Sequence, residues 1–235
     1  MVSRKRSKPV TAEELLKELH ADPEWVARKE AQEAKRQALA QAIYGSEAPL
    51  VADLRRAGFD VESGWDLFNR KEPGRKDVPI PPWPEAVPIL IDHLGRTYPF
   101  SVREGIVRAL TAPWGRVAFN RLVEEFRHTA DPRVAAEEQR QAVELVMVGA
   151  GDLYTRDEVE QIMGHRWESF RFALANAIGE HFEQEHIPLI VKLLRDEAHG
   201  LDRRRALADA LQKKMRRWRR RDAEVLALVE SLRSP

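Results

Sequence analysis

The part of the sequence best suited to binding chemistry is a basic run near the end of the chain. Residues 213–221 read Lys-Lys-Met-Arg-Arg-Trp-Arg-Arg-Arg, with seven cations and one tryptophan in nine positions. Lysine and arginine side chains bind phosphate groups, and an aromatic ring between them can stack on a base. The run therefore indicates a candidate polyanion site, made of Lys213, Lys214, Arg216, Arg217, Trp218, Arg219 and Arg220.

The same run also has a purely structural interpretation, as the end of a helix. Met215 and Trp218 continue an apolar stripe that begins with Leu207 and Leu211. Cations in the last turn of a helix complement the negative end of its dipole. We favour this interpretation and keep the polyanion site as the alternative.

A second set of candidate binding residues is a series of arginines at matched positions in helical segments. Each precedes an Ala-Leu or Ala-Ile pair by six residues, and the three are Arg103, Arg171 and Arg204. They could pair with acidic residues of the loops between helical hairpins, which would make them structural. They could also form a row of hydrogen-bond donors on one face. The structural role is the expectation.

The other residue clusters do not have the spacing that catalysis or metal binding needs. His181 and His186 flank two carboxylates, but five residues of separation place them about 140° apart on a helix. The absence of cysteine excludes a thiol nucleophile and a Cys-ligated metal. The Gly-Ala-Gly-Asp run at 149–152 lacks the Lys-Ser/Thr of a phosphate loop. We therefore expect no enzyme activity, no cofactor and no metal.

The remaining histidines are scattered singly, and most of them lie near the expected ends of helices. A cation is mildly favoured at a helix C-terminus, so we expect these side chains to act as surface caps. They are His20, His93, His128, His165 and His199.

Charge and hydropathy favour a cytoplasmic protein without a membrane segment. The 39 basic and 38 acidic residues leave a net charge of +1, so no overall field attracts polyanions. No apolar run approaches the roughly 20 residues that cross a bilayer. The basic N-terminus also lacks the apolar part of a signal peptide.

The composition divides the chain into four segments. Residues 1–9 form a basic tail that we expect to be disordered, because it has almost no apolar residue to anchor it. Residues 10–69 form a helical extension that starts with a Thr-Ala-Glu-Glu capping box. Residues 70–84 form a proline-rich linker, and residues 85–235 carry the helical body.

Within this body, two stretches about 100 residues apart repeat one pattern of two helices. Residues 85–110 and 185–211 match at Pro88 and Pro188, and again at Leu110 and Leu211. We expect about four hairpins, because such units bury their apolar faces only against neighbours. They would span 85–110, 115–148, 155–178 and 185–218, the third as a short helix to Met163 and another from Trp167, with a terminal lid after Asp222.

The string from Val102 to Leu110, Val-Arg-Glu-Gly-Ile-Val-Arg-Ala-Leu, resembles the second helix of a HEAT repeat. The resemblance covers 85–215 and implies an all-α HEAT-like solenoid whose second helices line a concave surface. Family members mostly bind other macromolecules. An aspartate common in the loop of such repeats is present at Asp196 but missing from 94–99. A HEAT-like alkylpurine DNA glycosylase has a comparable length, but this chain lacks a Trp-Trp-Asp-type cluster.

The expected function is therefore a non-catalytic protein-binding scaffold or adaptor that uses the concave face of the solenoid. The alternative is a nucleic-acid-binding protein that uses residues 213–221 together with the basic tail. Neither interpretation identifies the partner.

Overall fold

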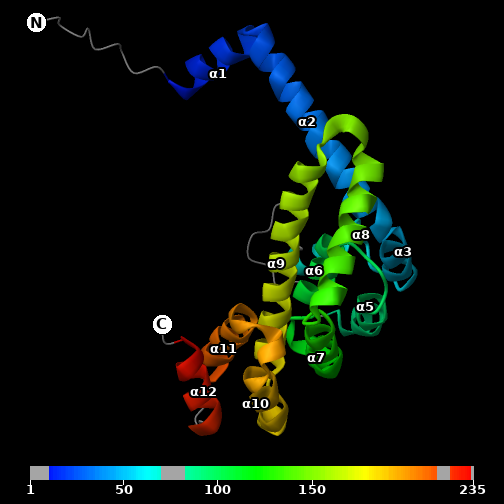
Figure 1. Cartoon of the computed structure of the whole chain (residues 1–235). Helices are drawn as coiled ribbons and strands as arrows, with labels where there is room; N and C mark the ends of the chain where they lie inside the picture. Colours follow the sequence, from blue (N-terminus) through cyan, green and yellow to red (C-terminus); the bar gives the residue numbers. More distant parts are fainter. Residues whose placement is uncertain (1–10, 70–82, 216–222, 234–235) are drawn as a thin grey trace, which may run out of the picture.

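The computed structural model describes residues 11–69, 83–215 and 223–233, and within these ranges every regular element is a helix (Figure 1). The all-α class expected from the sequence is confirmed. The tail expected at 1–9 lies outside the described residues, as does most of the expected linker. So do Arg216, Arg217, Trp218, Arg219, Arg220 and Asp222.

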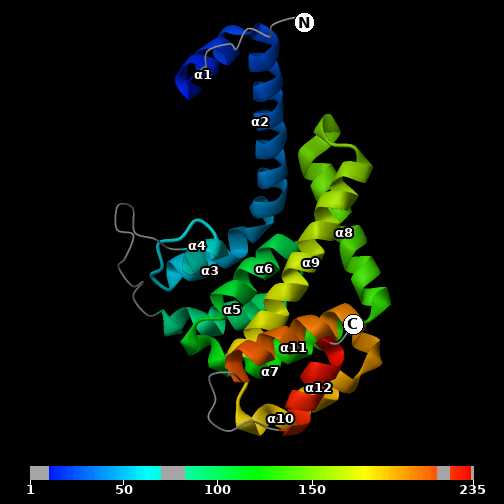
Figure 2. The ribbon, with the colours of Figure 1, turned by 90° about the vertical axis from the view of Figure 1, so that its left-hand side faces the viewer.

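The N-terminal helices form an arm that extends away from the rest of the protein (Figures 1 and 2). Helix α1 (Ala12–Ala21) begins with the expected capping box, in which the Glu14 amide donates to the Thr11 hydroxyl at 3.2 Å. Asp22 caps helix α2 (Pro23–Tyr44), which has proline in its first turn. No residue of α1 is buried, and this amphipathic helix contacts α2.

The segment that follows α2 packs into the main core. Helix α3 (Ala48–Arg56) buries Leu50 and Leu54 completely. In helix α4 (Gly64–Asn69), the Trp65 indole donates to the Ser101 carbonyl at 2.9 Å. A Cβ atom at Gly105 would lie 2.9 Å from the Trp65 ring, so glycine permits this close approach. Residues from Ala48 onward therefore share one core with the repeats.

The longest helix, α9, lies at the centre of the body and packs against α6, α7, α8 and α11 (Figure 2). It buries an apolar or aromatic stripe that includes Trp167, Phe170 and Leu174. The helices of the body are α5 (Val87–Leu94), α6 (Phe100–Ala109), α7 (Phe119–His128), α8 (Pro132–Ala150), α9 (Arg156–His181), α10 (Ile187–Arg195), α11 (Leu201–Met215) and α12 (Ala223–Arg233).

The first and last repeats form the expected helix pairs. Helix α5 contacts α6, and α10 contacts α11. Leu110 and Leu211, which the repeat aligns with each other, are both fully inaccessible to solvent. The two pairs flank α9 through α6 and α11, which lie against it.

The second expected hairpin, 115–148, is wrong. Helices α7 and α8 make few contacts with each other, and each packs on α9 instead. Helices α8 and α9 form one long hairpin, and α2 lies against α8 (Figure 2). A Cβ atom at Gly149 would lie 2.5 Å from the Cβ of Ala42, so this glycine allows α2 and α8 to meet closely. The contact between α2 and α8 therefore joins residues that are far apart in the sequence.

The third expected hairpin is also wrong, because α9 runs without a break from Arg156 to His181. The expected break at 164–166 contains Gly164 but no proline and no Ser, Thr, Asp or Asn that could cap a new helix. One interior glycine costs about 1 kcal/mol, whereas Met163 and Trp167 on either side of it are both buried. Packing therefore carries the helix through this position.

Among the helices that the structure describes, none combines the length and the apolar composition that crossing a membrane requires.

Candidate functional site

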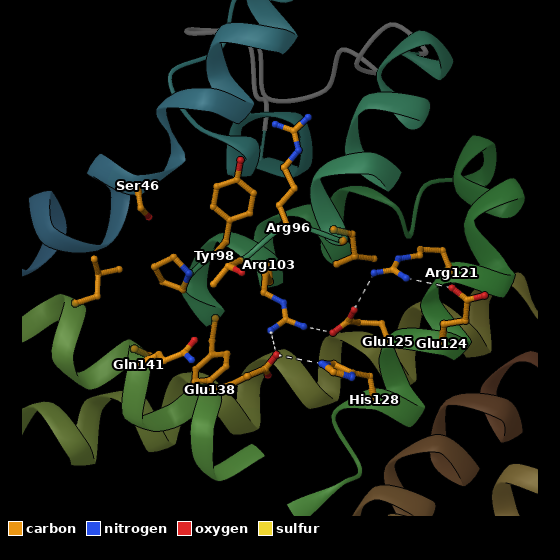
Figure 3. Close-up of a pocket in the computed structure, with 17 residues that line it drawn as sticks. Ser46, Arg96, Tyr98, Arg103, Arg121, Glu124, Glu125, His128, Glu138 and Gln141 are labelled. Atoms are coloured by element: carbon orange, nitrogen blue, oxygen red, sulfur yellow. Dashed lines mark hydrogen bonds and ion pairs between the residues drawn. The ribbon is translucent and has the colours of Figure 1, made fainter. Parts of the chain in front are cut away.

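An open cavity of about 670 Å³ lies where the connection between α5 and α6 faces α7 and α8 (Figure 3). Its floor is made of buried side chains from α6 and α7, and its rim carries exposed charged groups. The lining consists of Ser46, residues 94–100, Arg103, Arg121, Glu124, Glu125, His128, Glu138, Gln141, Ala142 and Leu145. We refer to it as the α6–α8 pocket.

Arg103 on α6 is the central charged group of the floor. Its side chain forms ion pairs with Glu125 of α7 and, at 2.9 Å, with Glu138 of α8. The guanidinium also lies over the ring of Phe170, 4.7 Å from the ring centre. Arg103 thus joins α6 to both α7 and α8.

Burial is the main influence on the pKa of Arg103. Desolvation lowers this pKa, and the carboxylate of Glu138 opposes the change. Because the ordinary pKa of arginine is above about 12, the guanidinium stays charged at neutral pH. The floor therefore holds a fixed positive charge that the neighbouring carboxylates must balance.

The ion pairs of the pocket contain more carboxylates than guanidinium groups. Arg121 adds a second guanidinium, whose contacts are 3.1 Å to Glu124 and 3.5 Å to Glu125. Glu124, Glu125 and Glu138 together share Arg103 and Arg121, which leaves one net negative charge when the nearby histidine is neutral. The Oε2 atom of Glu138 has no hydrogen-bond partner.

The wall formed by residues 95–99 is held in place by a buried histidine. His93 is fully buried and shares hydrogen bonds with the Tyr98 hydroxyl at 2.7 Å and with Asp53 at 2.9 Å. The expected role of His93 as a surface cap is therefore wrong, because α3 and the loop cover it. The hydrogen bond from His93 lowers the pKa of Asp53, and burial raises the pKa of Tyr98.

Several polar groups of the pocket already have hydrogen-bond or ion-pair partners within the protein. The hydroxyl of Ser46 donates to the Ile43 carbonyl at 2.7 Å, so it is already engaged with the backbone. The floor carboxylates of Glu125 and Glu138 form ion pairs with the guanidinium group of Arg103. Among the described residues, no group of three or more His, Asp or Glu side chains is positioned to hold a metal ion.

The three arginines of the matched series have different partners in the structure. Arg103 lies in the α6–α8 pocket, while Arg171 pairs with Glu168 of its own helix at 2.7 Å. Arg204 donates to the Leu194 carbonyl at 3.4 Å. Arg103 thus pairs with carboxylates of other helices, Arg171 with a carboxylate of its own helix, and Arg204 with a backbone carbonyl.

Two cations of the basic run are described, and both lie at the C-terminal end of α11. Lys213 is exposed, and Lys214 donates to the Glu180 carbonyl of α9. Lys213 also lines a smaller hollow of about 290 Å³ along α4, α6, α9 and α11, together with Phe68 and Arg108.

The two clustered histidines have separate environments. His181 shares a hydrogen bond with the Leu110 carbonyl, and His186 stacks on Phe119 with ring centres 3.7 Å apart. His199, expected as a surface cap, is buried against Phe126. These imidazoles serve packing between helices.

Sequence reasoning missed most of the pocket. The arrangement of Arg121 with Glu124 and Glu125 is a local signal, because residues three and four apart share a helix face. Glu138 and His128 have no such signal. They meet only because α7 and α8 both pack on α9.

Comparisons with protein-family models, with curated proteins and with solved structures find no match to this chain. Its function must therefore be inferred from the geometry of its own residues.

Proposed function

We propose that this chain is a non-catalytic adaptor that binds another protein. The α6–α8 pocket carries the proposal. It is large enough for a side chain with part of a backbone, and its charged groups are engaged with one another. Such a pocket offers shape and charge for recognition, and it lacks a free pair of groups poised for proton transfer.

The proposed architecture is a HEAT-like solenoid with one insertion. Helices α6 and α11 are the second helices of the two matched repeats, and both pack on α9. Helix α7 with the last half of α9 would make the middle unit, because these two helices are in contact. Helix α8 and the first half of α9 would then be an inserted hairpin that supplies one wall of the pocket.

Exposed apolar side chains support a macromolecular partner. Leu15 and Leu16 are half exposed on α1, a helix without buried residues. Phe172 on α9 is also more than half exposed. Apolar surface of this kind is typical of interaction sites when it gathers on one element.

The test compares proteins captured from an extract of the native host by the wild type and by two variants. Leu145→Asp places a charge in the pocket wall, and Val148→Asp is the matched control, because Val148 is 84% exposed on the same helix and outside the pocket. We expect a partner, identified by mass spectrometry, that the wild type and Val148→Asp retain and Leu145→Asp loses. Equal capture by all three proteins would contradict the proposed site.

The runner-up function is nucleic-acid binding through residues 213–221. It is favoured by the density of cations in this run and by the exposure of Lys213 at its start. A salt titration distinguishes it from the adaptor.

A further inference from the structure

We infer that the α6–α8 pocket receives a lysine or arginine side chain of the partner polypeptide. This inference rests on the proposed protein-binding function and adds the chemical class of the residue that is recognised. It follows from the charge balance of the pocket, from one unsatisfied carboxylate oxygen and from the pattern of residues along α8.

The charge balance favours a cation. Glu124, Glu125 and Glu138 share the guanidinium groups of Arg103 and Arg121, so with a neutral His128 the ion-pair network lacks one positive charge. An incoming ammonium or guanidinium group supplies it. An incoming carboxylate would instead add a second unbalanced negative charge in a partly desolvated site, where like charges repel strongly.

The other cation on the rim does not supply the missing charge. Arg96 forms an ion pair with Asp92 and lies 3.9 Å from Asp53. Asp92 lies on α5 and Asp53 lies on α3, and neither residue lines the pocket. The positive charge of Arg96 is therefore balanced away from Glu138.

Glu138 identifies the end of the pocket where the cation binds. Its Oε1 atom accepts from Arg103 at 2.9 Å and lies 3.6 Å from His128, while Oε2 has no partner. The side chain keeps 20% of its surface exposed. Rotation of the carboxylate toward the cavity lets a ligand donor satisfy the oxygen that is now unpaired.

The wall of α8 fits the alkyl part of a basic side chain. Glu138, Ala142 and Leu145 recur at helical spacing, and all three line the pocket. Ala142 lies one turn, or about 6 Å along the axis, from Glu138. The stripe thus passes from an apolar end at Leu145 to a carboxylate at Glu138, which matches a hydrocarbon stem with a terminal cation.

The experiment measures binding of blocked tripeptides to the full-length protein by isothermal titration calorimetry. The central residue is arginine, lysine, glutamate or citrulline, the last being close to arginine in shape but uncharged. We expect heat of binding from the arginine and lysine peptides alone. The citrulline peptide tests the role of charge without altering the protein, and binding equal to that of the arginine peptide would overturn the inference.

Variants on one helix locate the site. Glu138→Gln should weaken binding of the arginine peptide by about tenfold or more, because a charge-assisted hydrogen bond is lost. Glu144→Gln is the matched control on α8, since Glu144 is 46% exposed and pairs with Arg156 outside the pocket. It should bind as the wild type does. A thermal melt of each variant checks that the fold is retained.

Two further outcomes separate this inference from the proposed function. Agmatine carries the same cation without a peptide backbone, and binding as tight as that of the arginine peptide would make the pocket a site for free cations. Absence of binding by any cationic probe would sink the inference. A host partner that is lost with Leu145→Asp but retained by Glu138→Gln would uphold the adaptor function and overturn the basic-residue pocket.

Discussion

Arg103 of α6 and Glu125 of α7 form an ion pair in which the side chains keep only 6% and 3% of their surface exposed. Glu138 of α8 contacts the same guanidinium. This arrangement fixes three helices to one another and forms the floor of the α6–α8 pocket. The stability of the fold and the proposed recognition of a partner therefore both depend on it.

Removing one partner of this pair should destabilise the protein strongly. Glu125→Leu leaves Arg103 without its most buried counter-charge, and we expect a loss of about 3–5 kcal/mol in the free energy of unfolding. The double variant Arg103→Met with Glu125→Leu should recover most of the loss, since the carboxylate that then lacks Arg103, that of Glu138, keeps 20% of its side chain exposed to water. Urea denaturation measures both. A double variant no more stable than Glu125→Leu would contradict this account.

Two glycines in long helices should respond to alanine with opposite signs. A Cβ atom at Gly164 in α9 would have no neighbouring atom within 4 Å, so Gly164→Ala should stabilise the protein by about 0.5–1 kcal/mol. Gly149→Ala should destabilise it, because the new Cβ would lie 2.5 Å from that of Ala42. Thermal melts of both variants provide the comparison. A destabilised Gly164→Ala protein would indicate that α9 is broken after Met163.

The two aligned core leucines should be energetically similar. Leu110→Ala and Leu211→Ala should each cost about 2–5 kcal/mol, because both side chains are fully buried and their removal leaves a cavity. Chemical denaturation of each variant measures the cost, with exposed Leu201→Ala as the control. A negligible effect at either buried site would show that the repeat register is misassigned.

The contact between α2 and the α8–α9 hairpin should be detectable as a lowered pKa of Glu158 on α9. The hydrogen bond from Lys35, together with bonds from Thr155, lowers the pKa of Glu158 to about 2 from 4.5. A lowered acid pKa adds stability above pH 4.5, and this contribution is lost as pH falls toward 2. In Lys35→Met the pKa should rise toward its ordinary value, as followed by NMR. An unchanged pKa would mean that Lys35 does not reach Glu158 in solution.

A salt series decides between the adaptor and the nucleic-acid alternative. If residues 213–221 only end a helix, fluorescence anisotropy should show weak binding of DNA. If they bind phosphates, affinity should fall steeply with salt, and the slope should flatten by several units when four of the arginines become glutamine. The four positions are Arg216, Arg217, Arg219 and Arg220.

A control variant tests whether any such effect is local to the basic run. It changes exposed cations elsewhere to glutamine, at Arg28, Lys29, Arg36 and Arg140. Micromolar binding at physiological salt that this variant keeps and the basic-run variant loses would replace the adaptor with the alternative.

Features that depend on a few neighbouring residues can be predicted from the sequence. The capping box of Thr11 and Glu14 and that of Thr155 and Glu158 were recognisable because each joins positions three apart. The repeated pattern predicted the burial of Leu110 for the same reason, since helical spacing is local. Helix class, most helix starts and the first and last helix pairs follow from such signals.

Which helices meet, and which side chains form the pocket, could be learned only from the folded chain. Arg103 is 22 residues from Glu125 and 35 from Glu138, and no local spacing relates them. These residues come into contact because α7 and α8 each pack mainly on α9 and make few contacts with each other. This packing reflects the total apolar surface that the assembled helices bury. That surface depends on the whole fold and cannot be read from any short segment of the sequence.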